Sequence, residues 1–291
     1  MQRKLSNFTK HIINRVDLGK IRNSKLTLGT FDGCHIGHRT ILNKADYAIT
    51  FSPSPKVFFS QKEQVLTPVE EKTSLYKNFI VLKFDKYMAS LTAEKFLMEV
   101  ISLFQPREII IGWDFHFGKL STGNTQLLEV VADKHKIKVS IVDPIKVDNT
   151  TIKSTTIRQL VKKGCIKKAN QYLGYEYSYC SRVVRGKGVG RTLGFPTVNL
   201  DLIPGKLIPH AGVYAGYVIM GGNKYRTAIS ITVKEQIDIE GHILDFEGDI
   251  YDQDVCMIFT EFIRDQKKFA NHDLLTKQIS KDVKKIERVL A

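Results

Sequence analysis

The first 175 residues show short apolar runs that alternate with longer runs in which apolar residues recur at helical spacing. The short runs are rich in β-branched residues and predict strands at 25–31, 48–52, 79–84, 107–112 and 137–142. The amphipathic runs predict helices within 38–49, 69–78, 91–104 and 125–135, followed by two short helices within 154–174 that break at Gly164. Strands that alternate with helices in this way predict a parallel sheet covered on both faces.

The pattern changes after about residue 176, where strand-like runs follow one another with turn sequences between them. These runs lie at 177–186, 212–220, 224–233, 239–246 and 254–264. Several short strands at regular spacing predict an antiparallel barrel or sandwich. An amphipathic helix over 272–290 closes the chain. We therefore expect two domains, 1–175 and 176–291, as the length of 291 residues also indicates.

Composition limits the classes of protein that fit. No run of about 18 apolar residues is present, so no transmembrane helix is expected. The polar stretch at 1–16 lacks the apolar core of a signal peptide, and we expect a cytoplasmic protein. The four cysteines form no CxxC pair, so we expect free thiols and neither a zinc nor a redox site; they are Cys34, Cys165, Cys180 and Cys256.

The net charge of +14 is compatible with a polyanionic partner or with an ordinary lysine-rich surface. The basic residues are scattered, and the densest cluster, KDVKKIERVL, fits the polar face of the last helix. Because no basic run is interleaved with aromatic residues, we expect no nucleic-acid partner.

The stretch GTFDGCHIGH, 29–38, follows the first predicted strand, where parallel sheets bind their ligands. Gly29 and Gly33 allow a sharp turn and a close approach of backbone to a ligand. His35 and His38 share one face if a helix has begun, and its free N–H groups favour phosphate. A tight turn with two surface histidines, or a metal pair that lacks a third ligand nearby, are the alternatives. The stretch is not a Walker A loop.

A second glycine-rich stretch, RVVRGKGVGRTLGFPTVNL, covers 182–200. It misses the dinucleotide motif GxGxxG because Arg191 stands at the third glycine position, after Gly186 and Gly188. Glycine-rich backbone between strands can still surround phosphate groups as an anion nest.

Thr197 and Asn199 alternate along an extended segment, so both side chains can point at one ligand. A hydroxyl and an amide oxygen are hard donors that suit Mg²⁺. A hairpin loop followed by an edge strand is the alternative, and the residues alone favour neither interpretation.

Here the sequence resembles a known family. HxGH after a strand is similar to the nucleotidylyltransferase superfamily, and GTFDGCHIGH resembles the N-terminal half of bacterial bifunctional riboflavin kinase/FAD synthetases. TFSPSP at 50–55, IGWDFHFGK at 111–119 and KSTTIRQLVKKG at 153–164 match in the same order. The resemblance implies a Rossmann-like nucleotidylyltransferase domain in which His35, His38 and Arg158 are catalytic. Its nucleotide contacts would be Gly29, Phe31, Asp32, Gly33, Asp114 and Ser154.

The C-terminal half resembles the riboflavin kinases of the same family through GKGVGRTLGFPTVNL, HAGVYAGYV and IEGHILDFEGDIYDQDV. This resemblance implies an antiparallel β-barrel with a terminal helix. Thr197 and Asn199 would help hold Mg²⁺ with ATP, and Glu240 would act as base on the ribityl 5′-hydroxyl. The remaining nucleotide contacts implied are Gly186, Gly188, Gly190 and Arg191.

Some positions depart from the family pattern. Ser54 replaces a usual histidine, Lys153 replaces the first serine of the second signature, and Asp252 replaces a glycine. The stretch AISITVKEQ, 228–236, stands where relatives carry Asn-Ile-Gly-x-x-Pro-Thr.

The resemblance implies two consecutive ATP-dependent reactions, riboflavin to FMN in the C-terminal domain and FMN to FAD with release of pyrophosphate in the N-terminal domain. The alternative is that only the adenylyltransferase is robust, with a weakened kinase half. A further alternative, a basic nucleic-acid-binding protein on the same scaffold, is supported by the net charge alone. The expected partners are riboflavin, FMN and ATP, with no membrane, and the chain is expected as a monomer or weak oligomer.

Overall fold

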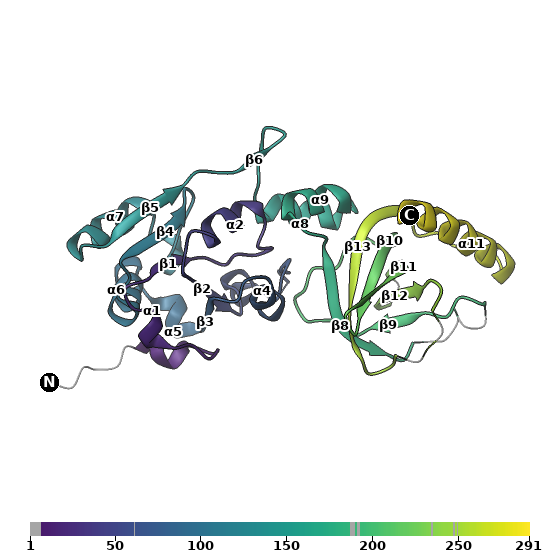
Figure 1. Ribbon diagram of the computed structural model, residues 1–291, viewed down its shortest axis with the longest axis horizontal. Coiled ribbons are helices and arrows are strands. Elements are labelled where there is room, and N and C mark those ends of the chain that lie inside the picture. Colours follow the sequence, from purple (N-terminus) through teal and green to yellow (C-terminus); the bar gives the residue numbers. More distant parts are fainter. Residues whose placement is uncertain are drawn as a thin grey trace. The chain divides into compact units, whose positions relative to one another are not determined.

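The computed structural model describes residues 7–60, 62–186, 190, 193–233, 235–246, 248 and 250–291. The chain falls into two compact units that divide after Ser154 (Figure 1). Gly188 and Arg191, two of the predicted nucleotide contacts, lie outside the described residues.

The first unit contains the predicted five-stranded parallel sheet, with strand order β3-β2-β1-β4-β5. The strands are β1 (Lys25–Leu28), β2 (Tyr47–Ser52), β3 (Phe79–Lys83), β4 (Glu108–Gly112) and β5 (Lys138–Val142). The order reverses direction between β1 and β4, and open parallel sheets bind ligands at the carboxyl ends of the strands at such a point.

Each face of this sheet carries its own hydrophobic core, because successive strand residues point to opposite sides. Ile80 and Leu82 belong to the cluster that packs under two helices, α6 (Ala93–Phe104) and α7 (Thr125–Lys134). Phe79 and Val81 belong to the opposite cluster, beneath α2 (Ile36–Leu42) and α4 (Val69–Leu75). Thr92 caps α6 as predicted, since its hydroxyl accepts a hydrogen bond from Lys95 N at 3.3 Å.

Several short elements were not predicted. They are η1 (Asn7–His11), α1 (Leu18–Ile21), α3 (Pro55–Phe59), α5 (Lys86–Ser90), η2 (Lys119–Ser121), β6 (Lys146–Val147) and β7 (Thr150–Thr151). Two to five residues show too little of a helix or strand period for a pattern to register.

The two predicted short helices are α8 (Ser154–Lys162) and α9 (Ile166–Leu173), separated by Gly164 at φ +73°. From Thr155 onward they group with the second unit, whereas the sequence expectation placed them in the first domain. The Asn170 side chain explains the grouping of α9, because it donates to Phe259 O and accepts from Tyr177 N, both at 2.8 Å.

The second unit is a closed barrel with strand order β10-β11-β12-β9-β8-β13, which confirms the predicted β-barrel. Its strands are β8 (Ser178–Val184), β9 (Val198–Leu200), β10 (Gly212–Met220), β11 (Asn223–Val233), β12 (Ile237–Ile243) and β13 (Asp254–Asp265), all paired antiparallel. Ile229, Ile231 and Ile239 are buried inside the barrel. The residues that alternate with them, such as Glu240, point outward.

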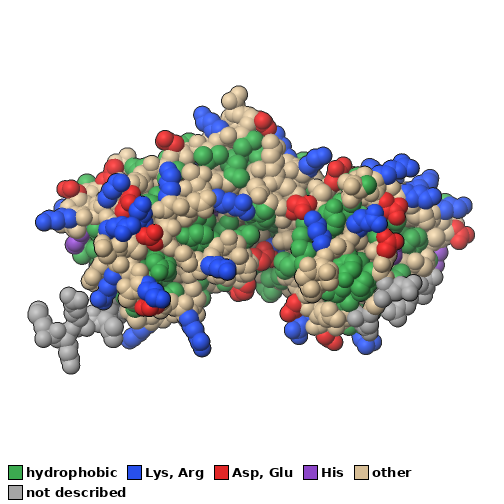
Figure 2. Space-filling model, viewed as in Figure 1, with side chains coloured by type: hydrophobic (Ala, Val, Ile, Leu, Met, Phe, Trp, Pro, Cys, Tyr) green, Lys and Arg blue, Asp and Glu red, His purple; other side chains and the backbone are tan. Residues whose placement is uncertain are grey.

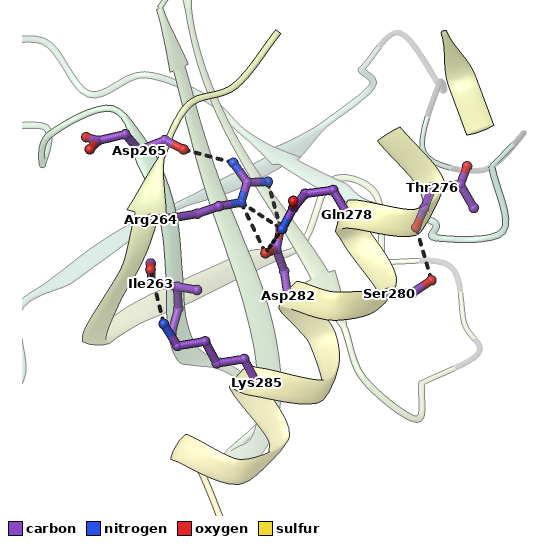
Figure 3. Close-up of polar contacts among 8 residues, drawn as sticks. All are labelled: Ile263, Arg264, Asp265, Thr276, Gln278, Ser280, Asp282 and Lys285. Carbon is purple, nitrogen blue, oxygen red and sulfur yellow. Dashed lines mark hydrogen bonds and ion pairs between the residues drawn. The ribbon is translucent and has the colours of Figure 1, made fainter. Parts of the chain in front are cut away.

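The predicted terminal helix, α11 (His272–Val289), packs on the outer surface of the barrel. The Arg264 guanidinium of β13 faces the buried Asp282 carboxylate of α11, with Nη2 to Oδ2 at 2.6 Å and Nε to Oδ2 at 2.9 Å (Figure 3). Gln278 also donates to Asp282, and Lys285 donates to Ile263 O. These bonds fix the helix on the strand because a buried, paired charge cannot move without losing its partner.

The prediction of four free thiols is wrong for one pair of cysteines. Cys180 and Cys256 stand opposite each other on β8 and β13 and form a disulfide. They lie 76 residues apart in the sequence, and only the strand pairing brings them together. Cys34, which is buried, and Cys165, which is exposed, are free.

Figure 2 shows lysine and arginine side chains spread among acidic and apolar ones on the face in view. Over the described ranges, none of the helices combines the length and the hydropathy that crossing a bilayer requires.

Candidate functional site

The turn between β1 and α2 forms the centre of the first candidate site. It begins as Gly29 N donates to Ile49 O on the neighbouring strand at 3.0 Å. The backbone is left-handed at Phe31 (φ +46°), Gly33 (φ +84°) and Cys34 (φ +36°). Positive φ is unfavourable for residues with a side chain, so the turn depends on its surroundings to persist. It brings the start of α2 to the carboxyl end of β1, at the point where the strand order reverses.

His35 and His38 lie together at the start of α2. His35 is the N-cap, and its Nδ1 accepts from His38 N at 3.2 Å. The two rings stack with centroids 3.6 Å apart and an angle of 18°. The Phe31 ring meets the His38 ring edge-on at 5.4 Å. The predicted pairing of the two imidazoles on one face is therefore present.

Both imidazoles are neutral near pH 7. Burial lowers the pKa of His35 to about 4. Burial, followed by the nearby charges of His35 and Lys72, holds the pKa of His38 well below its ordinary range. Because His35 accepts through Nδ1, its proton sits on Nε2, which leaves an N–H donor for a ligand. Nδ1 of His38 is buried without a hydrogen-bond partner among the described residues.

The underside of the turn is held by the segment 66–72, which sequence reasoning missed. Leu66 N and Thr67 N donate to Asp32 Oδ1 at 2.7 and 3.3 Å, and Gly33 N donates to the Thr67 hydroxyl at 2.9 Å. Lys72 Nζ donates to Thr30 O at 2.6 Å. Asp32, a predicted nucleotide contact, is thus 5% exposed, with its carboxylate bonded to backbone.

One sequence signal pointed to this segment. Lys72 stands on the same face of a short helix as Val69 and Tyr76, three residues after one and four before the other. Both of these residues pack against the core that contains Phe31 and Cys34. A lysine on a core-facing position is unusual and calls for a partner.

Asp114 lies at the carboxyl end of β4, the strand beside β1. Its carboxylate is 3.9 Å from Lys153 Nζ, which also lies 4.9 Å from the centre of the Trp113 ring. Trp113 is 45% exposed, and both charged side chains are about half exposed. A Cβ added at Gly112 would meet Ile41 of α2 at 3.3 Å, so α2 passes close to this strand end.

Ser154 and Arg158 begin α8. The Ser154 hydroxyl donates to Asp32 O at 2.8 Å and so links the second signature to the β1–α2 turn. Arg158 is 9% exposed, and its Nη2 donates to the Thr155 hydroxyl at 3.3 Å.

Glu240 and Asn199 form the second candidate site, on the outer surface of the barrel. They are direct partners in the antiparallel pairing of β12 with β9. Side chains at paired positions lie on one face about 5 Å apart. His242, two residues further along the same face, donates from Nδ1 to Pro196 O at 2.9 Å, and its ring meets the Phe195 ring edge-on at 5.4 Å. The segment that carries Thr197 is thereby anchored beside Glu240.

Two glycines lie directly against the predicted metal ligands. A Cβ added at Gly186 would stand 2.2 Å from Asn199 Nδ2, and one at Gly190 would stand 2.4 Å from Phe195 O and 3.2 Å from the Thr197 hydroxyl. Only glycine lets the backbone approach Asn199 and Phe195 O this closely. Hydroxyl, amide and carboxylate oxygens beside a glycine-rich cradle suit Mg²⁺ with a triphosphate. In the described part of the chain, no group of three or more His, Cys, Asp or Glu residues gathers as a metal site.

Comparisons with known proteins agree across both units. The profile of the FAD synthetase family matches residues 19–156, and the riboflavin kinase (Flavokinase) profile matches residues 173–290. The bifunctional riboflavin kinase/FMN adenylyltransferase of Listeria monocytogenes is 32% identical over 89% of this chain and 90% of its own. The chain belongs to the bifunctional riboflavin kinase/FMN adenylyltransferase family. The Bacillus subtilis member is 29% identical over 94% of this chain and 95% of its own.

A solved structure shares the fold over both units. The crystal structure described as a macrolide-efflux protein from Streptococcus pneumoniae is 31% identical, with a TM-score of 0.81. It covers 90% of this chain and 93% of its own.

The departures from the family pattern have visible places in the structure. Ser54 is the N-cap of α3, where its hydroxyl accepts from Val57 N at 3.5 Å. Lys153 pairs with Asp114. The residues 228–233 continue β11 in unbroken register with β12, and Ser230 stands opposite Glu240.

Proposed function

We propose that this family member makes FMN in its barrel and FAD in its first unit. In the first reaction the riboflavin 5′-hydroxyl attacks the γ-phosphate of ATP and releases ADP. In the second, the FMN phosphate attacks the α-phosphate of another ATP and releases pyrophosphate. The observation that carries the proposal is that the family similarity spans both units, with a separate polar cluster at each signature.

In the barrel, Glu240 orients the riboflavin hydroxyl and accepts its proton as the new P–O bond forms. Asn199, its partner across the strands, and Thr197 would hold Mg²⁺, which when bound neutralises charge on the phosphates of ATP. Gly186 and Gly190 let the backbone pack directly against Asn199 and the segment of Thr197, where a Cβ would not fit. The anchoring of Pro196 on His242 keeps this edge in place for the reaction.

In the first unit, the β1–α2 turn receives the triphosphate of ATP. His35 and His38, being neutral, act as hydrogen-bond donors to phosphate oxygens as charge redistributes between the α-phosphate and the leaving pyrophosphate. The start of α2 offers backbone N–H groups nearby. Gly29 and Gly33 shape the turn, because their own N–H groups bond to Ile49 O and to the Thr67 hydroxyl. Asp32 and Phe31 act from within the protein by shaping the turn, since both are buried.

Four more residues complete the assignment for this reaction. Asp114 and the neighbouring Lys153 contact nucleotide or flavin at the end of β4. Ser154 holds the turn through Asp32 O. Arg158 clamps phosphate, an assignment supported by its place in the second signature and by the fit of guanidinium to phosphate.

The test is separation of function in one chain. With riboflavin, ATP and Mg²⁺, chromatography of the products should show FMN followed by FAD. His38→Ala should stop FAD formation and leave FMN formation intact. Glu240→Ala should stop FMN formation from riboflavin, yet convert supplied FMN to FAD. Loss of both activities in either folded variant would contradict the division between the units.

We also propose a cytoplasmic location, because both reactions consume ATP. The Cys180–Cys256 disulfide weighs against it, since reducing compartments rarely preserve such bonds.

A further inference from the structure

Lys72 is a buried charged residue that the proposed reactions do not use. It is 3% exposed and lies in α4 between Val69 and Tyr76, on the side of the helix that faces the sheet. Lysine is rarely buried to this degree unless its ammonium group is paired. Burial lowers the pKa of Lys72, and the nearby Asp32 carboxylate opposes that effect.

The hydrogen bonds of Lys72 converge on a single carbonyl. Its Nζ donates to Thr30 O at 2.6 Å and to the Thr50 hydroxyl at 3.3 Å, and that hydroxyl itself donates to Thr30 O at 3.2 Å. Thr50 is fully buried on β2, so it cannot move away. The Thr30 carbonyl thus accepts hydrogen bonds from Lys72 of α4 and from Thr50 of β2.

The Thr30 carbonyl belongs to the part of the turn that precedes the two histidines. Phe31, the next residue, has positive φ, and its ring supports the His38 ring at 5.4 Å. Phe31 O accepts from Cys34 N at 3.0 Å, one residue before His35. Unfavourable backbone of this kind stays in place only where neighbours hold it. A displacement of the Thr30 backbone would therefore also displace the imidazoles of His35 and His38.

We propose that Lys72 is a positioning residue for the adenylylation of FMN. By holding the Thr30 carbonyl, it fixes the position of the stacked His35–His38 pair. This inference rests on the proposed function of the first unit. A purely structural lysine would stabilise the unit but leave turnover of the folded enzyme unchanged. Substitution of a positioning residue lowers kcat in fully folded protein, because misplaced hydrogen-bond donors stabilise the transition state less well.

The experiment compares six full-length proteins: wild type, Lys72→Met, Lys72→Arg, Thr50→Val, the double variant of Lys72→Met with Thr50→Val, and Lys77→Met. The last is the matched control, since Lys77 is an exposed lysine just beyond the same helix. Trp113 is the single tryptophan of the chain and lies in the first unit, so its fluorescence during urea titration gives the folded fraction of that unit. FAD formation from FMN and ATP then gives kcat and KM at concentrations where each protein is folded.

We expect Lys72→Met to lower kcat about 10- to 100-fold, the effect of removing a charge-assisted hydrogen bond, with KM for ATP and FMN within about threefold. Thr50→Val should lower kcat less, and the double variant should fall short of the product of the two effects, because both groups act on one carbonyl. Lys72→Arg should restore part of the loss. Lys77→Met and riboflavin phosphorylation by all variants should be unchanged.

An unchanged kcat in folded Lys72→Met overturns the inference, as does a rise in KM without a fall in kcat. If Lys72→Met does not fold, Thr50→Val and Lys72→Arg decide by the same criteria. If the wild type itself makes no FAD from FMN, the proposed function fails instead, so the two failures are distinguishable.

Discussion

The neutral state of His35 predicts a specific loss of stability in acid. His35 is 4% exposed and caps α2, and burial lowers its pKa from the ordinary 6.5 to about 4. In the unfolded chain the imidazole takes up a proton below about pH 6.5, whereas in the folded chain it does so only near pH 4. The unfolded state therefore binds more protons in this window, and stability falls as the pH falls.

The size of the effect follows from the difference between the two pKa values. One step in pKa corresponds to about 1.4 kcal/mol, so this histidine removes about 3 kcal/mol between pH 7 and pH 4. About 2 kcal/mol of that loss is already present at pH 5. Other groups titrate in the same range, so a reference variant is needed. His35→Asn retains a side-chain oxygen that caps the helix but removes the titrating group.

The assay is urea denaturation followed by Trp113 fluorescence at pH 7 and pH 5, with both proteins. The free energy of unfolding of the wild type should fall by about 2 kcal/mol more than that of His35→Asn. His38 remains in both proteins, and its contribution largely cancels. A difference that stays constant from pH 7 to pH 5 would refute the buried, neutral His35.

Three further predictions concern the barrel. Asp282→Ala leaves the Arg264 guanidinium without its buried partner and should destabilise the barrel by about 3–5 kcal/mol. Riboflavin phosphorylation should then be lost at a lower temperature while FMN adenylylation persists. Equal thermal loss of both activities would contradict the assignment of the Arg264–Asp282 pair to the barrel. Gly186→Ala places a Cβ 2.2 Å from Asn199 and should lower riboflavin phosphorylation by about tenfold or more with FAD formation from FMN unchanged, and normal phosphorylation would argue against the cradle. Thiol titration of denatured, unreduced protein should detect two thiols, those of Cys34 and Cys165. All four cysteines should react only after reduction, and four thiols without reductant would exclude the Cys180–Cys256 disulfide.

Much of the fold follows from periodicity in the sequence. The strands of the parallel sheet are β-branched apolar runs, and the helices over them have a clear apolar face, so both could be predicted. The three-residue β9 carries Asn199 but is too short to show an alternation. Its role in closing the barrel appears only when it pairs with β12 and β8.

The candidate sites were predictable to the level of motifs. His35, His38 and Asn199 stand out because their residue types and spacing suit phosphate chemistry. Glu240 is indicated only by the resemblance to riboflavin kinases. The sequence does not reveal that Asp32 is turned inward onto backbone, nor that Lys72 lies beneath the turn. Both facts depend on contacts between residues 34 to 42 apart, which no local pattern encodes.

The central claim is that the two units use two molecules of ATP in chemically different ways. Incubation of the full chain with riboflavin and Mg²⁺, once with γ-labelled and once with α-labelled ATP, tests it directly. We predict that the γ-label enters FMN and is carried into FAD, whereas the α-label, among the flavin products, enters only FAD. FMN without the γ-label, or FAD without the α-label, would contradict the account.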